Sequence, residues 1–99
     1  MIRFKITSSN NKYNVNVEGH ANYDEKGYDI VCAAASTVLI VIITVIDNLG
    51  YNIEDYQESD GKVSFSCIKD DKTSAIIKTL EESFDVLAKD YPLYVKIIK

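Results

Sequence analysis

The chain has 99 residues, of which 46% are hydrophobic and 26% are charged, and its formal net charge is −4. This length predicts one domain over residues 1–99 with a single core, and the hydrophobic content argues against disorder. Nucleic-acid-binding domains concentrate Lys and Arg on one surface, so the acidic balance and the lack of a basic cluster argue against direct binding of nucleic acid.

Cysteine and histidine are scarce, since the chain holds only Cys32, Cys67 and His20. Two cysteines do not make a disulfide framework. With one histidine they also fall short of a structural zinc site, unless acidic residues or a second chain contribute ligands. Residues Met1–Thr7 alternate like a strand and lack the apolar core of a signal peptide. We therefore expect a cytoplasmic protein with reduced thiols, and no metal or cofactor.

Two alternating segments open the chain. Ile2–Thr7 and Tyr13–Glu18 each alternate apolar and polar residues, and the polar run Ser8–Lys12 separates them. This pattern predicts two half-buried strands joined as a hairpin. The second strand ends at Gly19 and His20, so it places the histidine where a strand becomes a loop, a usual place for side chains that act rather than pack.

The longest apolar run follows a polar loop at residues 21–28. We expect a helix from Ile30 to about Asn48, with Asp29 as its N-cap and Gly50 just beyond its end. β-branched residues favour strands, but the segment is too long for one. It is also shorter than the roughly 20 residues of a spanning helix and lacks interfacial anchors. We therefore expect no membrane insertion and a helix buried centrally or shared with a partner subunit.

The second half of the chain repeats the order of the first. The expected elements are a weak strand at Tyr51–Tyr56, a turn at Ser59–Lys62, a strand at Val63–Cys67, a helix that starts within Lys69–Lys72 and stops before Pro92, and a strand at Leu93–Ile98. Cys67 shares a strand face with Val63 and Phe65, which predicts a core thiol. The order β-β-α-β-β-α-β predicts an α+β fold, a mostly antiparallel sheet with two helices on one face.

The stretch between His20 and Cys32 carries the candidate chemistry. If Asp29 caps the helix, Cys32 lies in the first turn, where free backbone N–H groups and the helix dipole favour a thiolate. A protonated His20 nearby would add to this effect. The Asp29 charge opposes it, unless that carboxylate is used for capping or for orienting the histidine. The same N–H groups could hold the oxyanion of an acyl-transfer intermediate.

The residues alone leave other interpretations open. A cysteine in an apolar run is usually a small buried hydrophobe, and sequence does not fix the adjacency of Cys32 and a histidine. Ser36 shares a helix face with Cys32, so it could line the same pocket or simply allow close packing. Gly19 and Gly27 suit backbone conformations that other residues resist, and Gly27 could also be a hinge that lets the loop open.

The same stretch resembles the motif of a known family. Gly19-His20-Ala21, then Gly27, then the run from Asp29 to Ser36 (Asp-Ile-Val-Cys-Ala-Ala-Ala-Ser) resemble the ribosomal-processing cysteine proteases, the Prp family. The resemblance extends over the whole chain. Ala34 stands where many members have Gly, and the helix after Ser36 is unusually rich in Ile and Val.

The resemblance implies an endopeptidase with Cys32 as nucleophile and His20 as general base. Members of the family remove a short N-terminal extension from the large-subunit ribosomal protein numbered twenty-seven, cutting within an extended, hydrophobic peptide that contains Phe. They are homodimers. Asp29 and Ser36 match further motif positions whose roles are open, and Asp29 and Asp24 are the candidates for a third catalytic residue.

Two rival hypotheses remain from the sequence. The first is a non-enzymatic module for ribosome assembly or interaction, in which Cys32 is structural. The second is a thiol redox sensor that uses Cys32, either alone or with Cys67, although the two cysteines lack the Cys-x-x-Cys spacing.

Overall fold

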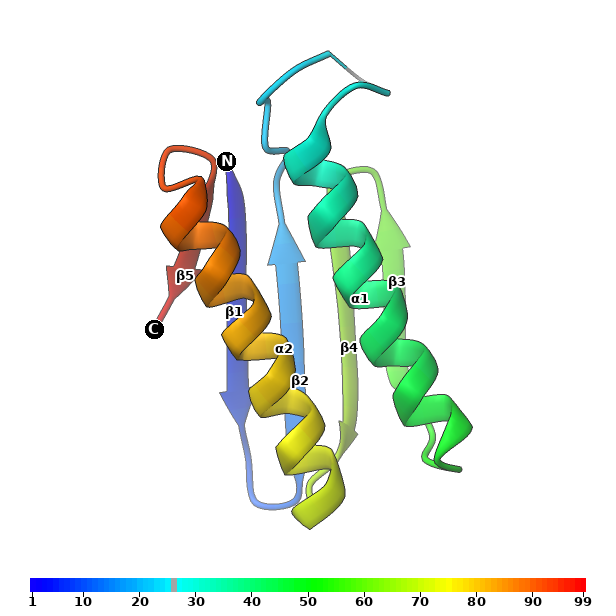
Figure 1. Ribbon diagram of the computed structural model, residues 1–99. Coiled ribbons are helices and arrows are strands. Elements are labelled where there is room, and N and C mark those ends of the chain that lie inside the picture. Colours follow the sequence, from blue (N-terminus) through cyan, green and yellow to red (C-terminus); the bar gives the residue numbers. More distant parts are fainter. Residues whose placement is uncertain (26) are drawn as a thin grey trace.

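The structure is a computed structural model that describes residues 1–25 and 27–99, and it consists of one sheet covered on one face by two helices (Figure 1). The elements are β1 (Ile2–Ser8), β2 (Lys12–Glu18), α1 (Ile30–Asn48), β3 (Glu54–Ser59), β4 (Lys62–Ile68), α2 (Asp71–Asp90) and β5 (Val95–Ile98). The order β-β-α-β-β-α-β and the α+β class predicted from the sequence are confirmed.

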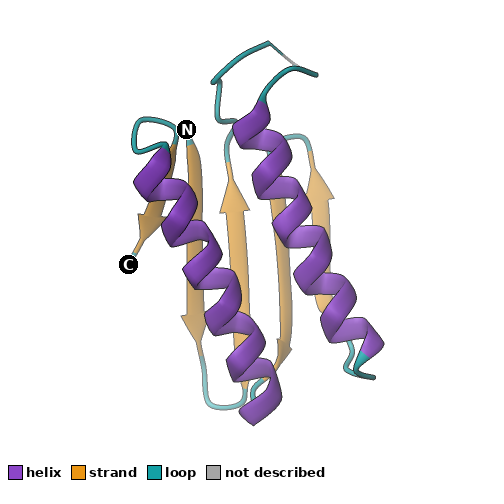
Figure 2. Ribbon diagram, in the orientation of Figure 1, coloured by secondary structure: helices purple, strands orange, loops and turns teal. Residues whose placement is uncertain are grey.

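The five strands lie in the order β3-β4-β2-β1-β5. The pairs β1–β2, β2–β4 and β3–β4 are antiparallel, whereas β5 returns parallel to β1. The sheet is therefore mostly antiparallel, as expected. Figure 2 shows both helices lying along the same face of this sheet.

The core lies between that face and the helices. Alternate strand residues point into it because side chains of a strand alternate between faces. Phe4 of β1 stacks on Phe84 of α2 with ring centroids 4.2 Å apart. Cys67 lies on β4 in the same layer as Phe65 and is fully buried, so the prediction of a core thiol is confirmed.

Two strands begin later than the alternation predicts. β3 starts at Glu54 rather than Tyr51, because Tyr51 is still held by the end of α1, where its N–H donates to the Ile46 carbonyl at 3.2 Å. β5 starts at Val95 rather than Leu93, because the N–H groups of Tyr94 and Val95 both donate to the Tyr91 carbonyl in a turn after α2. A local turn wins over strand pairing in both places.

Helix α1 is buried along one row only. Val31, Ala35, Leu39, Ile42 and Ile46 face the core, but the opposite side is exposed, with Ile40 at 64%. The expectation of central burial is therefore wrong, because the sheet covers only one side of this layer. Sharing with a partner subunit stays a prediction. Within the described residues, α1 is the one helix whose length and composition would also suit a membrane span, a test that core helices of soluble proteins also pass.

Candidate active site

Three segments meet at one end of the sheet: the end of β2, the start of α1 and the turn between β3 and β4 (Figure 1). They enclose a pocket of about 950 Å³, within the size range of small-ligand sites. The lining includes every site residue proposed from the sequence: Gly19, His20, Gly27, Asp29, Cys32 and Ser36. The fold thus brings together residues that the sequence could only place in order along the chain.

Cys32 occupies the first turn of α1. Asp29 is the N-cap and its Oδ1 accepts a hydrogen bond of 2.9 Å from the Cys32 N–H, so the expected capping arrangement is confirmed. The thiol is free and half-buried. Buried Val31 anchors this turn to the core, which leaves the cysteine on the pocket side of the helix.

The Asp29 carboxylate joins the helix start to the preceding loop. While Oδ1 caps Cys32, Oδ2 accepts from the N–H groups of Tyr23 and Asp24 at 3.0 and 3.5 Å. Partial burial acts to raise the pKa of Asp29, but the backbone N–H donors outweigh it and hold the pKa below its usual value. Asp29 is therefore an ionised acceptor for backbone groups, and its charge is spent on capping.

This capping changes the expected oxyanion site. The Cys32 N–H donates to Asp29 Oδ1, and the Ala33 N–H donates to the Asp29 carbonyl at 3.0 Å. The Cys32 N–H was expected to be free for an oxyanion, and in this structure it is not, because the capping side chain of Asp29 accepts its hydrogen bond. The Ala33 N–H is used by the first regular hydrogen bond of the helix.

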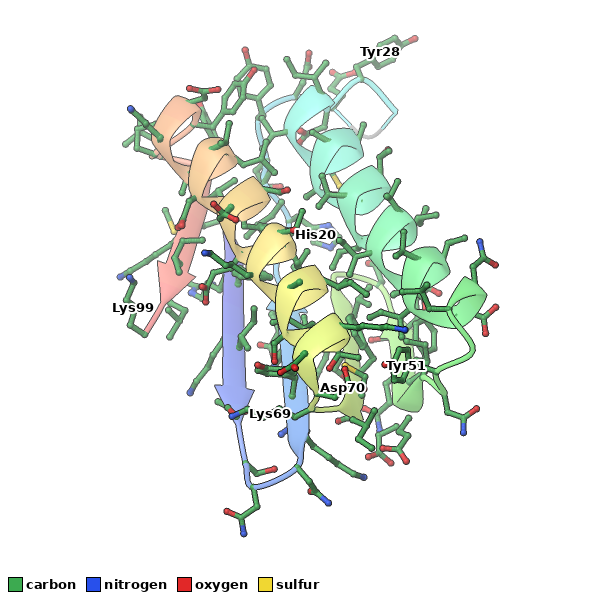
Figure 3. All side chains as sticks on the ribbon, turned by 60° about the horizontal axis from the view of Figure 1, so that its bottom comes forward. His20, Tyr28, Tyr51, Lys69, Asp70 and Lys99 are labelled. Carbon is green, nitrogen blue, oxygen red and sulfur yellow. The ribbon has the colours of Figure 1, made fainter. Side chains whose placement is uncertain are left out.

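His20 is the exposed residue that ends the β2 segment (Figure 3). Its backbone is fixed on two sides, because the Met1 amine donates to the His20 carbonyl at 2.5 Å and the Gly19 N–H donates to the Gly61 carbonyl at 2.7 Å. Gly19 has φ +98°, and a Cβ there would lie 2.1 Å from the Met1 carbonyl oxygen. Position 19 therefore requires glycine on both conformational and steric grounds.

The β3–β4 turn supplies two neighbours of His20 that sequence reasoning missed. The His20 Nε2 lies 3.6 Å from Asp60 Oδ1, and a Cβ on Gly61 would approach the same nitrogen to 2.8 Å. The sequence correctly predicts a turn at these positions. Their closeness to His20 depends on β2 pairing with β4, which no local pattern reveals.

The loop between His20 and α1 has no regular secondary structure in its described part, as expected; the prediction for residues 21–28 also covers residue 26, which lies outside the described residues. The Tyr23 ring packs edge-on against Tyr91 and Tyr94, with centroids 5.5 and 5.1 Å apart. Tyr28 projects away from the fold (Figure 3) and is 73% exposed. Gly27 adopts φ +92° in this loop, and its proposed role as a hinge stays a prediction.

Asn22 is a further pocket residue that the sequence did not indicate. It lines the pocket and adopts φ +55°. Asn tolerates this left-handed conformation better than most residues. The Asn-Tyr-Asp composition of the loop indicated a turn, but nothing in it indicated that position 22 faces the site.

Cys67 lies outside this pocket, in the core. Burial raises the pKa of the Cys67 thiol, and the charges of Asp70 and Glu54 raise it further. A buried thiol with a raised pKa is a poor nucleophile, so the structure gives no support to a redox pair with Cys32. Among the described residues, no group of three or more His, Cys, Asp or Glu side chains is arranged to hold a metal ion.

The chain is similar to known proteins over nearly all of its length. A family model described as "Cysteine protease Prp" matches residues 1–96. The ribosomal processing cysteine protease Prp of Staphylococcus aureus is 30% identical over 79 residues, which cover 76% of this chain and 74% of that protein.

Two crystal structures of the S. aureus protease share the fold. The complex with a covalently linked product peptide has a TM-score of 0.87 at 28% identity and covers 98% of this chain and 97% of that chain. The complex with a substrate peptide has a TM-score of 0.75 at 27% identity and covers 99% and 98%. Together with the match to the family model, these similarities show that the chain belongs to the Prp family of cysteine proteases.

Proposed function

We propose that this protein is a cytoplasmic cysteine endopeptidase that removes the N-terminal extension of the large-subunit ribosomal protein numbered twenty-seven. The observation that carries the proposal is the single pocket lined by both His20 and Cys32, with the cysteine in the first turn of a helix. Membership of a family of ribosomal-processing proteases supports the reaction and the substrate class. The free thiols of Cys32 and Cys67 suit a reducing compartment.

The reaction follows from two side chains. His20 takes the proton of the Cys32 thiol, and the thiolate attacks the scissile carbonyl to give a tetrahedral intermediate. As the intermediate collapses, His20 gives the proton to the leaving amine and an acyl-enzyme forms on Cys32. Water, activated by His20, then attacks the thioester and releases the new carboxylate.

The oxyanion of the intermediate needs donors beyond those in the cap. We propose that substrate binding draws the Asp29 carboxylate away from the Cys32 N–H, which frees that donor for the oxyanion. The bond is a single contact of 2.9 Å at a partly buried site, and a hydrogen bond from the same N–H to the oxyanion replaces it. Ser36 and Gly27 then serve as pocket walls, with Ser36 one helical turn beyond the nucleophile.

We also propose that the chain works as a homodimer through the outer face of α1. Ile40, Val41 and Val45 are 64%, 52% and 37% exposed there. Contiguous apolar surface of this kind marks an interaction site, and a second copy of the chain is the partner that the family resemblance implies.

The decisive experiment is peptide cleavage with matched cysteine variants. The substrate is a synthetic peptide that copies the N-terminal extension of the ribosomal protein, and its cleavage is followed by mass spectrometry. Cys32→Ala and His20→Ala should each lower the rate by at least a thousandfold, because both residues act in the same step. Cys67→Ala is the control, since it removes the other thiol from outside the pocket, and it should retain cleavage.

Each alternative predicts a different result. A Cys32→Ala protein that still cleaves the peptide would contradict the proposal. A non-enzymatic assembly module would bind the peptide without cutting it, in the wild type and in every variant. A redox sensor would show a reversible change in the thiol state of Cys32, again without cleavage.

A further inference from the structure

The pocket is lined by four carboxylates, and three of them are engaged away from His20. Asp29 accepts from the backbone at the start of α1. Asp24 accepts from the Glu25 N–H at 2.7 Å, and Glu58 accepts from the Tyr56 hydroxyl at 2.9 Å. The fourth, Asp60, is the carboxylate that faces the imidazole, with its Oδ1 3.6 Å from Nε2.

The backbone holds this turn against the histidine. The Gly19 N–H donates to the Gly61 carbonyl, which ties the residue before His20 to the residue after Asp60. Gly61 lacks the Cβ that would lie 2.8 Å from Nε2, and its φ of +72° also favours glycine. In this position the ring occupies space that a Cβ at position 61 would enter.

The orientation of the His20 ring determines which of its two nitrogens can act as the base. In neutral imidazole one nitrogen carries the proton and the other accepts one. A carboxylate beside Nε2 favours the proton on Nε2, which leaves Nδ1 as the base. A third group that fixes the tautomer of the base in this way recurs in cysteine and serine hydrolases on unrelated folds. Such contacts are often long in the free enzyme and shorten when substrate binds.

We propose that Asp60 is a positioning residue for His20: its carboxylate holds the Nε2–H tautomer, so that Nδ1 is available to take the Cys32 proton. This replaces Asp29 and Asp24, the candidates named from the sequence, because their carboxylates bind backbone groups. The proposal rests on the proteolytic function given above. It assigns the β3–β4 turn the task of orienting the base.

The expected effect is moderate, because the Asp60 side chain is 90% exposed and solvent weakens such pairs. Asp60→Asn should lower kcat about two- to fivefold with KM unchanged. Asn is as acceptable as Asp at this turn position, so the variant removes the charge and keeps the hairpin. Asp60→Glu, which keeps the carboxylate, should restore at least half of the lost rate.

The matched control is Glu54→Gln. It removes the same charge from the same β3–β4 hairpin, but Glu54 pairs with Lys12 at 2.9 Å and lies outside the pocket. This variant should keep the wild-type kcat and KM. A loss equal to that of Asp60→Asn would mean that net charge matters and not the position of Asp60.

A second readout does not depend on cleavage. His20 is the one histidine of the chain, so its ring nitrogens can be assigned in long-range ¹H–¹⁵N NMR spectra without ambiguity. The proposal expects the Nε2–H tautomer to dominate in the neutral wild-type ring, and a mixture of tautomers in Asp60→Asn. A wild-type ring protonated on Nδ1, or a wild-type kcat in Asp60→Asn, would overturn the proposal. Failure of the wild type to cleave any peptide would instead overturn the proposed function.

Discussion

The two helices cover the same face of one sheet and begin in the same way, yet they do different work. α1 has 19 residues and α2 has 20, and both are capped by aspartate, Asp29 and Asp70. The cap of α1 lies beside the pocket and bonds the Cys32 N–H. The cap of α2 lies at the far end of the sheet and bonds the N–H of buried Thr73.

The α2 cap is closed on every side. The Asp70 N–H donates to Thr73 Oγ1 at 2.9 Å, which completes a capping box, and the Thr73 hydroxyl donates to the Ile68 carbonyl at 2.7 Å. The Tyr51 hydroxyl donates to the second Asp70 oxygen at 2.5 Å (labelled in Figure 3). The side chains of Tyr51 and Thr73, together with the Ile68 carbonyl, thus hold the Asp70 cap at the start of α2.

The α1 cap is open by comparison. Its partners are backbone N–H groups of Cys32 and of the loop at Tyr23 and Asp24. The same local rule therefore gives two outcomes, because the partners differ. The α2 cap is bonded to side chains and stabilises the fold. The donor of the α1 cap is the backbone N–H of Cys32, the proposed nucleophile, so this cap can also release its donor to substrate.

The largest predicted difference between the two caps is their effect on catalytic activity. Asp29→Ala should lower kcat/KM at least tenfold, about 1.4 kcal/mol of transition-state stabilisation, because the turn of Cys32 and the loop after His20 lose their common anchor. Asp70→Ala should leave kcat/KM of the folded protein unchanged. Both variants should lower Tm by several degrees because each loses a helix cap. Peptide cleavage assays well below Tm, with Tm measured by circular dichroism, separate the two effects.

Asp29→Asn sharpens this test. Asn is as good an N-cap as Asp, but its amide offers one acceptor oxygen, so it can keep the cap or the loop contacts and not both. We expect activity between that of the wild type and that of Asp29→Ala. Wild-type activity in Asp29→Ala would show that the open cap has no part in the site.

The next difference concerns the outer faces of the helices. Ile40 of α1 and Val86 of α2 are both exposed apolar residues, at 64% and 59%. Ile40→Lys should weaken the proposed homodimer at least tenfold, because it places an unpaired charge in an apolar interface. Val86→Lys makes the same chemical change on the other helix and should leave the dimer intact. Sedimentation velocity at several concentrations measures both, and a monomeric wild type would contradict the dimer.

The smallest predicted effect is the response to acid. Hydrogen bonds from the Tyr51 hydroxyl and then from the Thr73 N–H lower the pKa of Asp70, and backbone N–H groups lower that of Asp29 against the opposing effect of burial. A carboxyl group whose pKa is lower in the folded state stabilises that state at pH values above its unfolded pKa of about 3.8. This contribution is lost as the pH falls through the folded pKa. Stability should therefore fall as the pH drops below about 4.

Amide variants test the origin of this acid response. Urea unfolding of Asp70→Asn and Asp29→Asn at pH 5 and pH 3 should show a smaller loss on acidification than the wild type, because each variant lacks one carboxylate that must be protonated. An unchanged loss in both would assign the acid response to other carboxylates.

Local chemistry made much of the fold predictable. Alternation located β1, β2 and β4, and Asp29 and Gly50 marked both ends of α1, where Gly50 indeed adopts φ +87°. The exposure of Ile40 was not predictable, because apolar composition does not say which side of a helix the sheet covers. β3 was also faint, since an exposed edge strand rich in Glu and Asp has no buried face to produce alternation.

The site likewise contains residues that the sequence could indicate and residues that it could not. Cys32 and His20 could be proposed because they flank one short loop and match a family motif. Asp60 and Gly61 could not, because their distance from His20 follows from the strand order. The sequence predicted that Asp29 caps the helix. It did not predict that the cap occupies the Cys32 N–H, which is then not free to bind an oxyanion.

The pairing of β2 with β4 has a consequence for the newborn chain. His20 and Cys32 emerge from the ribosome almost together, but the Asp60–Gly61 turn reaches them only after α1 and β3 have been made and β4 has paired with β2. Closing such a long loop is among the slower steps of folding. A half-made chain therefore carries both reactive groups without the turn that lies beside the His20 ring, so the proposed orientation of the base is completed only when the sheet has formed.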